Sequence, residues 1–340
     1  MRWFPFAAVL AAVLLVGSGC GLCWPRGEGL QQCPASDDDD ATDDDDATDD
    51  DDATDDDDAV DDDDATDDDD AAPDCATGDP ISGTTIDAHG YEMRCVVPDT
   101  EPFLMGSPAS RDPRDDDEAL HEVTLTRRYA LGTVEVDIAF YEAITTLTPS
   151  NCDYGCGDAN PVQQVRWDLA LDFMNTLSDL DGLERVYTIT KTDLVVDWDA
   201  SGYRFPSEAE WEFAALAGDP GGQTLYPGSA DIDEACWHRD NSDDTTHIGG
   251  QLAPNAWGFR DLCGNLREWV FDAYEHHGED PVVDPTGPLG SSFRVVKGGS
   301  FIDRPEDLRI ANRSFDTSGG APWIGFRVAR TMPGGAAPAE

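Results

Sequence analysis

Positive charge is scarce in this chain of 340 residues, which has 21 Lys and Arg residues against 72 Asp and Glu residues and a formal net charge of −51. Nucleic-acid-binding proteins neutralise the phosphate backbone with Lys and Arg side chains. We therefore expect no nucleic-acid partner. Cationic partners and divalent cations remain compatible with this charge.

A long apolar segment is also missing. The N-terminal apolar run, residues 4–16, is shorter than the roughly 20 residues that cross a membrane, and it follows Arg2, as in an export signal. Small residues directly before Cys20 resemble the lipobox of bacterial lipoproteins, although Gly17 stands where leucine is usual. We expect a signal peptide at residues 1–19 and a lipid anchor on Cys20, which would bind the membrane. Secretion without a lipid and a retained membrane anchor are the alternatives.

The excess of negative charge is concentrated in one repeat. Residues 37–70 contain six tetra-aspartate blocks, and without these 24 aspartates the net charge of −51 falls to −27. Such blocks repel one another and bury no apolar surface. We expect residues 20–80 to form a disordered tether that acts as a spacer, with a calcium-collecting arm as the alternative. No stretch has the spacing of an organised calcium loop.

Eight cysteines remain besides Cys20, and an even number in an exported chain favours disulfides. The sequence does not fix their connectivity. Pairing of neighbours is the simplest prediction, and it gives Cys23 with Cys33, Cys75 with Cys95, Cys152 with Cys156, and Cys236 with Cys263.

Residues 81–331 have a globular composition and are numerous enough for one domain with a core, followed by a tail at 332–340. Helices are predicted from Asp137 to Ala143, from Trp167 to Leu180, and after Ser207, where Ser207 and Glu210 form a capping box and Gly218 and Pro220 end the helix. Short strands are predicted in HEVTL (121–125) and FRVVK (293–297). The pattern indicates an irregular α+β domain.

Four motifs in order resemble the formylglycine-generating enzyme, or sulfatase-modifying factor, family. They are FLMGSPASRDPRDDDEALHEVTL with VEVD, GYRFPSEAEWEFAALAG, NAWGFRDLCGNLREWVFDAY, and RVVKGGSF followed by NRS and IGFRVAR. The resemblance covers residues 100–330. It implies an α+β fold related to the C-type lectin fold, usually with structural calcium.

The resemblance implies copper chemistry, but the two cysteines that bind copper in the family are missing from this chain. In the family's oxidases, two cysteines after the Gly-Gly-Ser-aromatic turn bind copper and activate oxygen, because thiolates suit Cu(I). Here these positions are Asp303 and Leu308, and residues 295–314 contain neither cysteine nor histidine. We therefore expect no copper and no catalytic residues. His276 and His277 are expected to be solvent-exposed.

The family's calcium ligands correspond to Asp261, the carbonyl groups of Gly264 and Leu266, and Glu268. Oxygen ligands of this kind suit calcium. The alternative is a tight turn in which Glu268 is buried against an arginine. Arg267 stands where many members have a tryptophan that lines the substrate groove.

We therefore interpret the chain as an exported, lipid-anchored domain of the bacterial cell envelope that faces the periplasm or the cell surface. It would act as a binding or structural module, with Arg267, Ser300, Asp303 and Arg304 lining a cleft for a peptide or glycan. The alternative is an oxidoreductase of the sulfatase-modifying-factor type, a metal-dependent oxidase with a changed mechanism.

Cys20 should incorporate labelled palmitate when the full chain is expressed in a bacterium, because acylation would anchor the protein through buried CH₂ groups, each contributing about 0.8 kcal/mol. The variant Cys20→Ser should remain unlabelled and leave the membrane fraction. Equal labelling of both proteins would exclude the anchor.

Overall fold

The computed structural model describes Cys75 and residues 81–98, 101–148, 152–191, 193–217, 219, 224–288 and 290–333. The expected signal peptide, Cys20, the aspartate repeat, Cys23 and Cys33 lie outside these residues. Among the described residues, no helix has the length and apolar character needed to cross a membrane.

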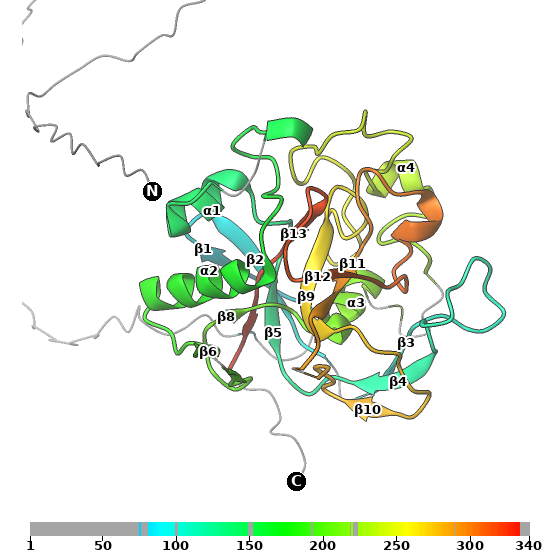
Figure 1. The fold of residues 1–340 in the computed structure, drawn as a ribbon. Helices are drawn as coiled ribbons and strands as arrows, with labels where there is room; N and C mark the ends of the chain where they lie inside the picture. Colours follow the sequence, from blue (N-terminus) through cyan, green and yellow to red (C-terminus); the bar gives the residue numbers. More distant parts are fainter. Residues whose placement is uncertain are drawn as a thin grey trace, which may run out of the picture. The chain divides into compact units, whose positions relative to one another are not determined.

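The predicted α+β class is confirmed, with strands grouped in small curled sheets (Figure 1). A five-stranded sheet has the order β1-β2-β5-β14-β8, and a four-stranded sheet has the order β12-β11-β9-β13. A three-stranded sheet, β10-β4-β3, and the hairpin β6-β7 complete the set. The strands are β1 (Ile81–Ala88), β2 (Tyr91–Val96), β3 (Phe103–Met105), β4 (His121–Thr124), β5 (Tyr129–Gly132), β6 (Tyr187–Ile189), β7 (Leu194–Val196), β8 (Tyr203–Arg204), β9 (Arg267–Ala273), β10 (Val282–Val283), β11 (Phe293–Lys297), β12 (Ser314–Thr317), β13 (Ile324–Phe326) and β14 (Ala329–Thr331).

All three predicted helices are present. Helix α1 (Ile138–Thr145) is capped by Asp137, whose side chain accepts a hydrogen bond from the N–H of Phe140, and α2 spans Trp167–Leu180 as predicted. Helix α3 (Glu208–Leu216) has the predicted capping box, and its C-cap is Ala217, which takes the left-handed conformation. Three short elements were not predicted from the sequence: α4 (Ile232–Ala235) and the 3₁₀ turns η1 (Cys152–Tyr154) and η2 (Pro305–Leu308).

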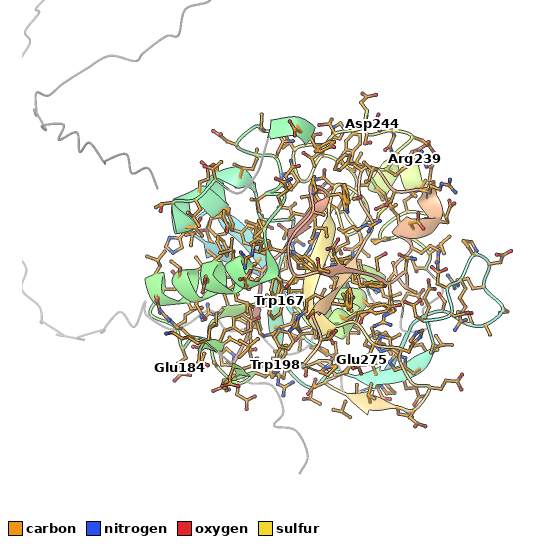
Figure 2. All side chains as sticks on the ribbon, viewed as in Figure 1. Trp167, Glu184, Trp198, Arg239, Asp244 and Glu275 are labelled. Carbon is orange, nitrogen blue, oxygen red and sulfur yellow. A yellow bond between two sulfur atoms is a disulfide. The ribbon has the colours of Figure 1, made fainter. Side chains whose placement is uncertain are left out.

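Aromatic side chains fill the space between these elements (Figure 2). Trp167, at the start of α2, stacks on Phe205 and donates a hydrogen bond from Nε1 to the carbonyl oxygen of Val270 in β9. A second apolar cluster surrounds Trp211 of α3 and includes Val295 of β11. Helix α3 and the four-stranded sheet are therefore packed together by side chains that the motifs contribute.

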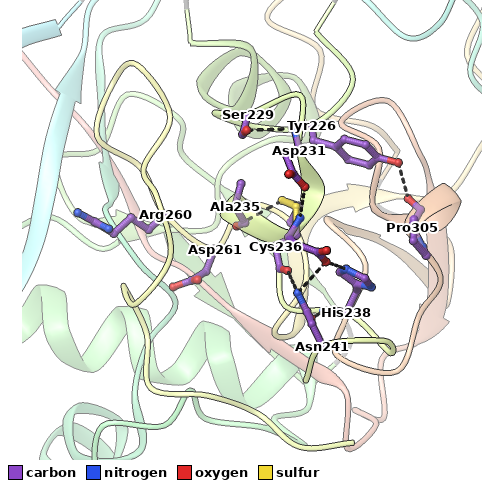
Figure 3. The surroundings of a disulfide bond; sticks show 12 residues. Tyr226, Ser229, Asp231, Ala235, Cys236, His238, Asn241, Arg260, Asp261 and Pro305 are labelled. Carbon is purple, nitrogen blue, oxygen red and sulfur yellow. Dashed lines mark hydrogen bonds and ion pairs between the residues drawn. A yellow bond between two sulfur atoms is a disulfide. The ribbon is translucent and has the colours of Figure 1, made fainter. Parts of the chain in front are cut away.

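Two of the predicted disulfides are confirmed. Cys75 is bonded to Cys95, and Cys236 is bonded to Cys263. The second bond ties the end of α4 to the turn before β9, and both of its cysteines are buried (Figure 3). Disulfides of this kind are typical of proteins from oxidising compartments.

The predicted bond between Cys152 and Cys156 is wrong, because Cys156 is an exposed free thiol. Gly155 turns the chain between the two cysteines with a φ of +100°. This turn is held without sulfur, since the carbonyl oxygen of Gly155 accepts a hydrogen bond from Gln163 and a Cβ at Gly155 would lie 2.5 Å from Thr246 Oγ1.

Alkylation of the native protein without a reductant should modify Cys156 and leave Cys75, Cys95, Cys236 and Cys263 unmodified, as read by peptide mass mapping. After reduction and unfolding all five should react. Protection of Cys156 in the native, unreduced protein would contradict the structure.

Candidate functional site

The position of the family's first catalytic thiol holds a fully bound carboxylate. Arg267, the first residue of β9, donates from Nε to Asp303 Oδ2 at 2.8 Å and from Nη2 to Oδ1 at 2.6 Å. The N–H and hydroxyl groups of Ser300 donate to Oδ2 at 2.9 and 2.7 Å. Asp303 is 9% exposed, so this bidentate pair is largely shielded from water.

The position of the second thiol is apolar. Leu308 ends η2, is fully buried, and packs with the Cys236–Cys263 disulfide. A Cβ at Gly299 would lie 2.8 Å from Leu308 Cδ1, so the Gly-Gly turn is needed for this contact. No soft metal ligand stands at either family position.

The predicted cleft residues do not all line one surface. Ser300 is fully buried, because its polar groups close the turn onto Asp303. The side chain of Arg304 is 64% exposed and lies 3.7 Å from Glu306 instead of pairing with Asp303. The ion-pair partner of Asp303 is Arg267 from β9.

Among the predicted calcium ligands, Glu268 is bound by side chains of the protein itself. Arg327 donates from Nε and Nη2 to the two carboxylate oxygens of Glu268 at 2.7 and 2.6 Å, and Trp211 Nε1 donates to Oε2 at 2.8 Å. This is the alternative named above, in which Glu268 is buried against an arginine. Both carboxylate oxygens of Glu268 therefore accept hydrogen bonds from side chains in this arrangement.

Asp261 differs from Glu268 because only one of its carboxylate oxygens accepts a hydrogen bond from a described residue. Its Oδ2 accepts the N–H of Gly250, whereas its buried Oδ1 has no hydrogen-bond partner. Burial raises the pKa of Asp261, and burial together with Asp261 and Glu268 holds the pKa of nearby Glu135 well above its usual range. No group of three or more acidic, His or Cys side chains in the described ranges is arranged to hold a metal. Calcium binding by this set stays a prediction.

Residues 92–332 match the family described as the sulfatase-modifying factor enzyme 1-like domain. The chain belongs to this family. Formylglycine-generating enzymes from Streptomyces coelicolor and Thermomonospora curvata are each 33% identical to it, over 38% and 42% of this chain and 47% and 54% of those enzymes. The chain therefore spans about half the length of these enzymes.

Two further kinds of relative share the domain. The chaperone protein LppX of Paenibacillus barcinonensis is 30% identical over 209 residues, which is 52% of this chain and 71% of LppX. Among solved structures, Treponema denticola variable protein 1 and PvdO from Pseudomonas aeruginosa are each 25% identical, with TM-scores of 0.64 and 0.60. They cover 73% and 74% of this chain, and 98% of each of those chains is matched.

This sulfatase-modifying-factor domain also contains a network of buried charges that was not predicted from the sequence. Arg313 donates to both oxygens of Glu208 at 2.7 and 3.0 Å, and Lys297 Nζ lies 2.9 Å from Glu212. Although burial opposes ionisation, Arg313, His277 and Lys297 hold the pKa of Glu208 well below its usual range. Every residue of α3 is buried. The signal was a short helix whose three glutamates, Glu208, Glu210 and Glu212, do not share one face and are surrounded by Ala, Trp, Phe and Leu, so that buried glutamates need cations.

His277 belongs to this network, so the prediction of two solvent-exposed histidines is wrong for it. Its Nε2 lies 3.3 Å from Glu208 Oε2, and its side chain is 22% exposed. Its ring lies 5.0 Å from that of buried His121. His276 is exposed as predicted.

Asp272 of β9 completes the network. It is buried, and its Oδ2 accepts the N–H of Glu208 at 2.7 Å. Burial and the adjacent Glu208 charge raise the pKa of Asp272 to about 8. The native state therefore holds a proton that the unfolded chain releases near its ordinary pKa of about 4.

The stability of the domain should consequently fall as the pH rises from about 4 to 8, because between these two pKa values the native state binds more protons than the unfolded state. The side chain of the variant Asp272→Asn stays neutral at every pH. Its free energy of unfolding should therefore fall by about 2–5 kcal/mol less than that of the wild type across this range. Thermal melting at pH 5 and pH 9 measures the difference. Asp172→Asn, at an exposed position of α2, is the control, and parallel curves for wild type and Asp272→Asn would contradict the assignment.

Proposed function

We propose that this protein is a polypeptide-binding module of the sulfatase-modifying-factor family that performs no formylglycine chemistry. The observation that carries the proposal is Asp303, which replaces the first catalytic thiol and is bound by Arg267 and Ser300. A carboxylate with four donors in place is not available to a metal. Leu308 offers no ligand atom at the second position.

A family member without the copper-binding cysteines still has the family's fold, whose loops and strand edges can bind a ligand. Copper(I) prefers soft sulfur ligands, so the proposal includes no copper. LppX, matched over 71% of its length, is called a chaperone protein, which favours a polypeptide over a glycan as the ligand. The proposal therefore takes unfolded or extended polypeptide as the ligand class.

The location is part of the same proposal. The Cys75–Cys95 and Cys236–Cys263 disulfides are consistent with an extracytoplasmic protein. An anchor on Cys20 and the aspartate-rich segment would present the domain away from the membrane of the cell envelope. Structural calcium at Asp261, Gly264, Leu266 and Glu268 is included only as a site to be tested.

The second candidate function is an oxidase with a changed metal. It is favoured by the similarity to formylglycine-generating enzymes and by the free Oδ1 of Asp261. Metal analysis of protein purified without added metal separates the two. Calcium alone or no metal supports the module, whereas stoichiometric copper or iron supports the oxidase.

The purified protein should form no aldehyde when it is incubated with Cu(I), oxygen and a cysteine-containing sulfatase peptide, as read by mass spectrometry. The Streptomyces coelicolor enzyme is the positive control. The same preparation should suppress aggregation of reduced, unfolded lysozyme in a light-scattering assay.

Aldehyde formation by the wild type would overturn the first half of the proposal. Its loss in Asp303→Ala would then make Asp303 a catalytic residue. Unchanged lysozyme aggregation at a tenfold molar excess of the protein would overturn the second half.

A further inference from the structure

The four-stranded sheet ends in an unpaired edge strand. Strand β12 pairs only with β11 in the described part of the chain, with Val295 opposite Phe315 and Phe293 opposite Thr317. Phe315 is 47% exposed and Thr317 is also exposed. The edge is therefore accessible to solvent.

The backbone groups that face outward from β12 follow from the register. The N–H of Tyr274 donates to the carbonyl oxygen of Phe293, so Phe293 directs its backbone groups towards β9. Alternation along β11 then directs Arg294 towards β12, where it faces Asp316. Phe315 and Thr317 consequently point their backbone groups away from the sheet. The carbonyl oxygen of Thr317 accepts the N–H of Gly319, whereas the N–H of Thr317 has no backbone acceptor among the residues that the structure describes.

An aromatic patch lies on one face of this edge and consists of Tyr274, Phe293 and Phe315. The ring centroids of Phe315 and Tyr274 are 4.4 Å apart, and those of Phe293 and Phe315 are 5.3 Å apart. Phe293 is 46% exposed. Two exposed phenylalanine rings and half-buried Tyr274 beside an open strand edge offer an apolar anchor next to outward-facing backbone groups.

The surroundings of the aromatic patch are acidic. Tyr274 donates its hydroxyl to Asp117 at 2.6 Å, and exposed Glu275 follows it in the chain. Residues 273–293 contain four carboxylates and no Lys or Arg; Glu275, Glu279 and Asp280 are exposed, whereas Asp284 is paired with Arg127. The neighbouring cation Arg313 is buried and already paired with Glu208. Charge complementarity therefore favours a basic ligand.

We infer that the β12 edge binds an extended basic polypeptide segment, which adds a strand to the sheet and places an apolar side chain on the aromatic patch. The inference rests on the proposed polypeptide-binding function and assigns its site. The carbonyl and N–H of Phe315 and the N–H of Thr317 pair with the incoming backbone. The carboxylates near Tyr274 select Lys and Arg.

This surface is separate from the former catalytic position. Arg239, whose backbone N–H donates to the carbonyl oxygen of Asp303, lies at one end of the domain, and Glu275 lies at the opposite end of the view (Figure 2). The hydrogen bonds that Asp303 accepts come from Arg267 and Ser300 and involve neither Phe315 nor Thr317, so we expect substitutions at these two residues to leave the Asp303–Arg267 pair intact.

The probe is a fluorescein-labelled ten-residue peptide in which Lys alternates with Val or Phe, and binding to the full protein is measured by fluorescence anisotropy. A peptide with Glu in place of Lys tests the charge. A peptide with alternate backbone amides N-methylated tests the added strand. Both should bind at least tenfold more weakly, and salt should weaken the parent peptide.

Two variants with matched controls locate the site. Thr317→Pro removes one outward N–H without removing a bond to β11, and prolines are tolerated at such edge positions. It should weaken binding about tenfold, whereas Thr317→Val, which keeps the N–H, should not. Phe315→Ser should weaken binding to a similar extent, whereas Val283→Ser, at an exposed position of β10, should have no effect. Thermal melting confirms that each variant is folded.

The outcomes distinguish this inference from the proposed function. If Thr317→Pro and Phe315→Ser are folded and bind the peptide like the wild type, the β12 site is wrong, even where lysozyme aggregation is still suppressed through another surface. If the wild type binds neither peptide nor lysozyme, both proposals fail. Displacement of the peptide by a soluble oligosaccharide would assign the aromatic patch to glycans and overturn the inference.

Discussion

One buried arginine joins the two larger sheets of this domain. Arg327 lies between β13 of the four-stranded sheet and β14 of the five-stranded sheet. It binds Glu268 through two nitrogens and donates to the carbonyl oxygens of Gly132, Arg260 and Asp261. Removing one member of such a pair costs about 3–5 kcal/mol, because the other charge is left buried without a partner. The positions of β5, β9 and the 260–261 loop all depend on this contact.

Buried ion pairs of this kind also explain why the fold does not need the copper-binding thiols for its stability. Its buried charges are paired within the protein, through Arg327 with Glu268, Arg313 with Glu208, and Arg204 with Glu210. None of these pairs requires the thiols that the family's oxidases use. The turn around Ser300 is stabilised in the same way, because the carboxylate of Asp303 satisfies Arg267 and the turn's own donors. The fold therefore does not depend on those thiols.

The two surfaces considered for binding differ in their physical character. At Asp303 the polar groups are saturated by internal partners, so this region offers a ligand little that is unpaired. At β12 the backbone groups of Phe315 face outward, and the rings of Phe293 and Phe315 are exposed in the described structure. We therefore place the binding site at the β12 edge because its surface is accessible, and not because it resembles a catalytic site.

The sequence by itself determined the α+β class, three helices, and the absence of the thiol pair. These features depend on local signals, namely the capping groups at Asp137 and Ser207, the helical spacing after Trp167, and residue identity at Asp303. The Cys75–Cys95 and Cys236–Cys263 disulfides also agreed with pairing of neighbours. The same rule failed for Cys156, because the turn at Gly155 is held by contacts with distant residues.

Only the tertiary structure decided which charges meet. Arg267 and Asp303 are 36 residues apart, and Arg309 reaches Glu118 across 191 residues. Short-range spacing predicted neither pair, since Asp303, Arg309 and Glu118 lie in turns and loops whose positions are set by the folded chain. The edge of β12 is likewise a property of strand order, because a sequence shows that a strand forms but not which strand remains without a neighbour.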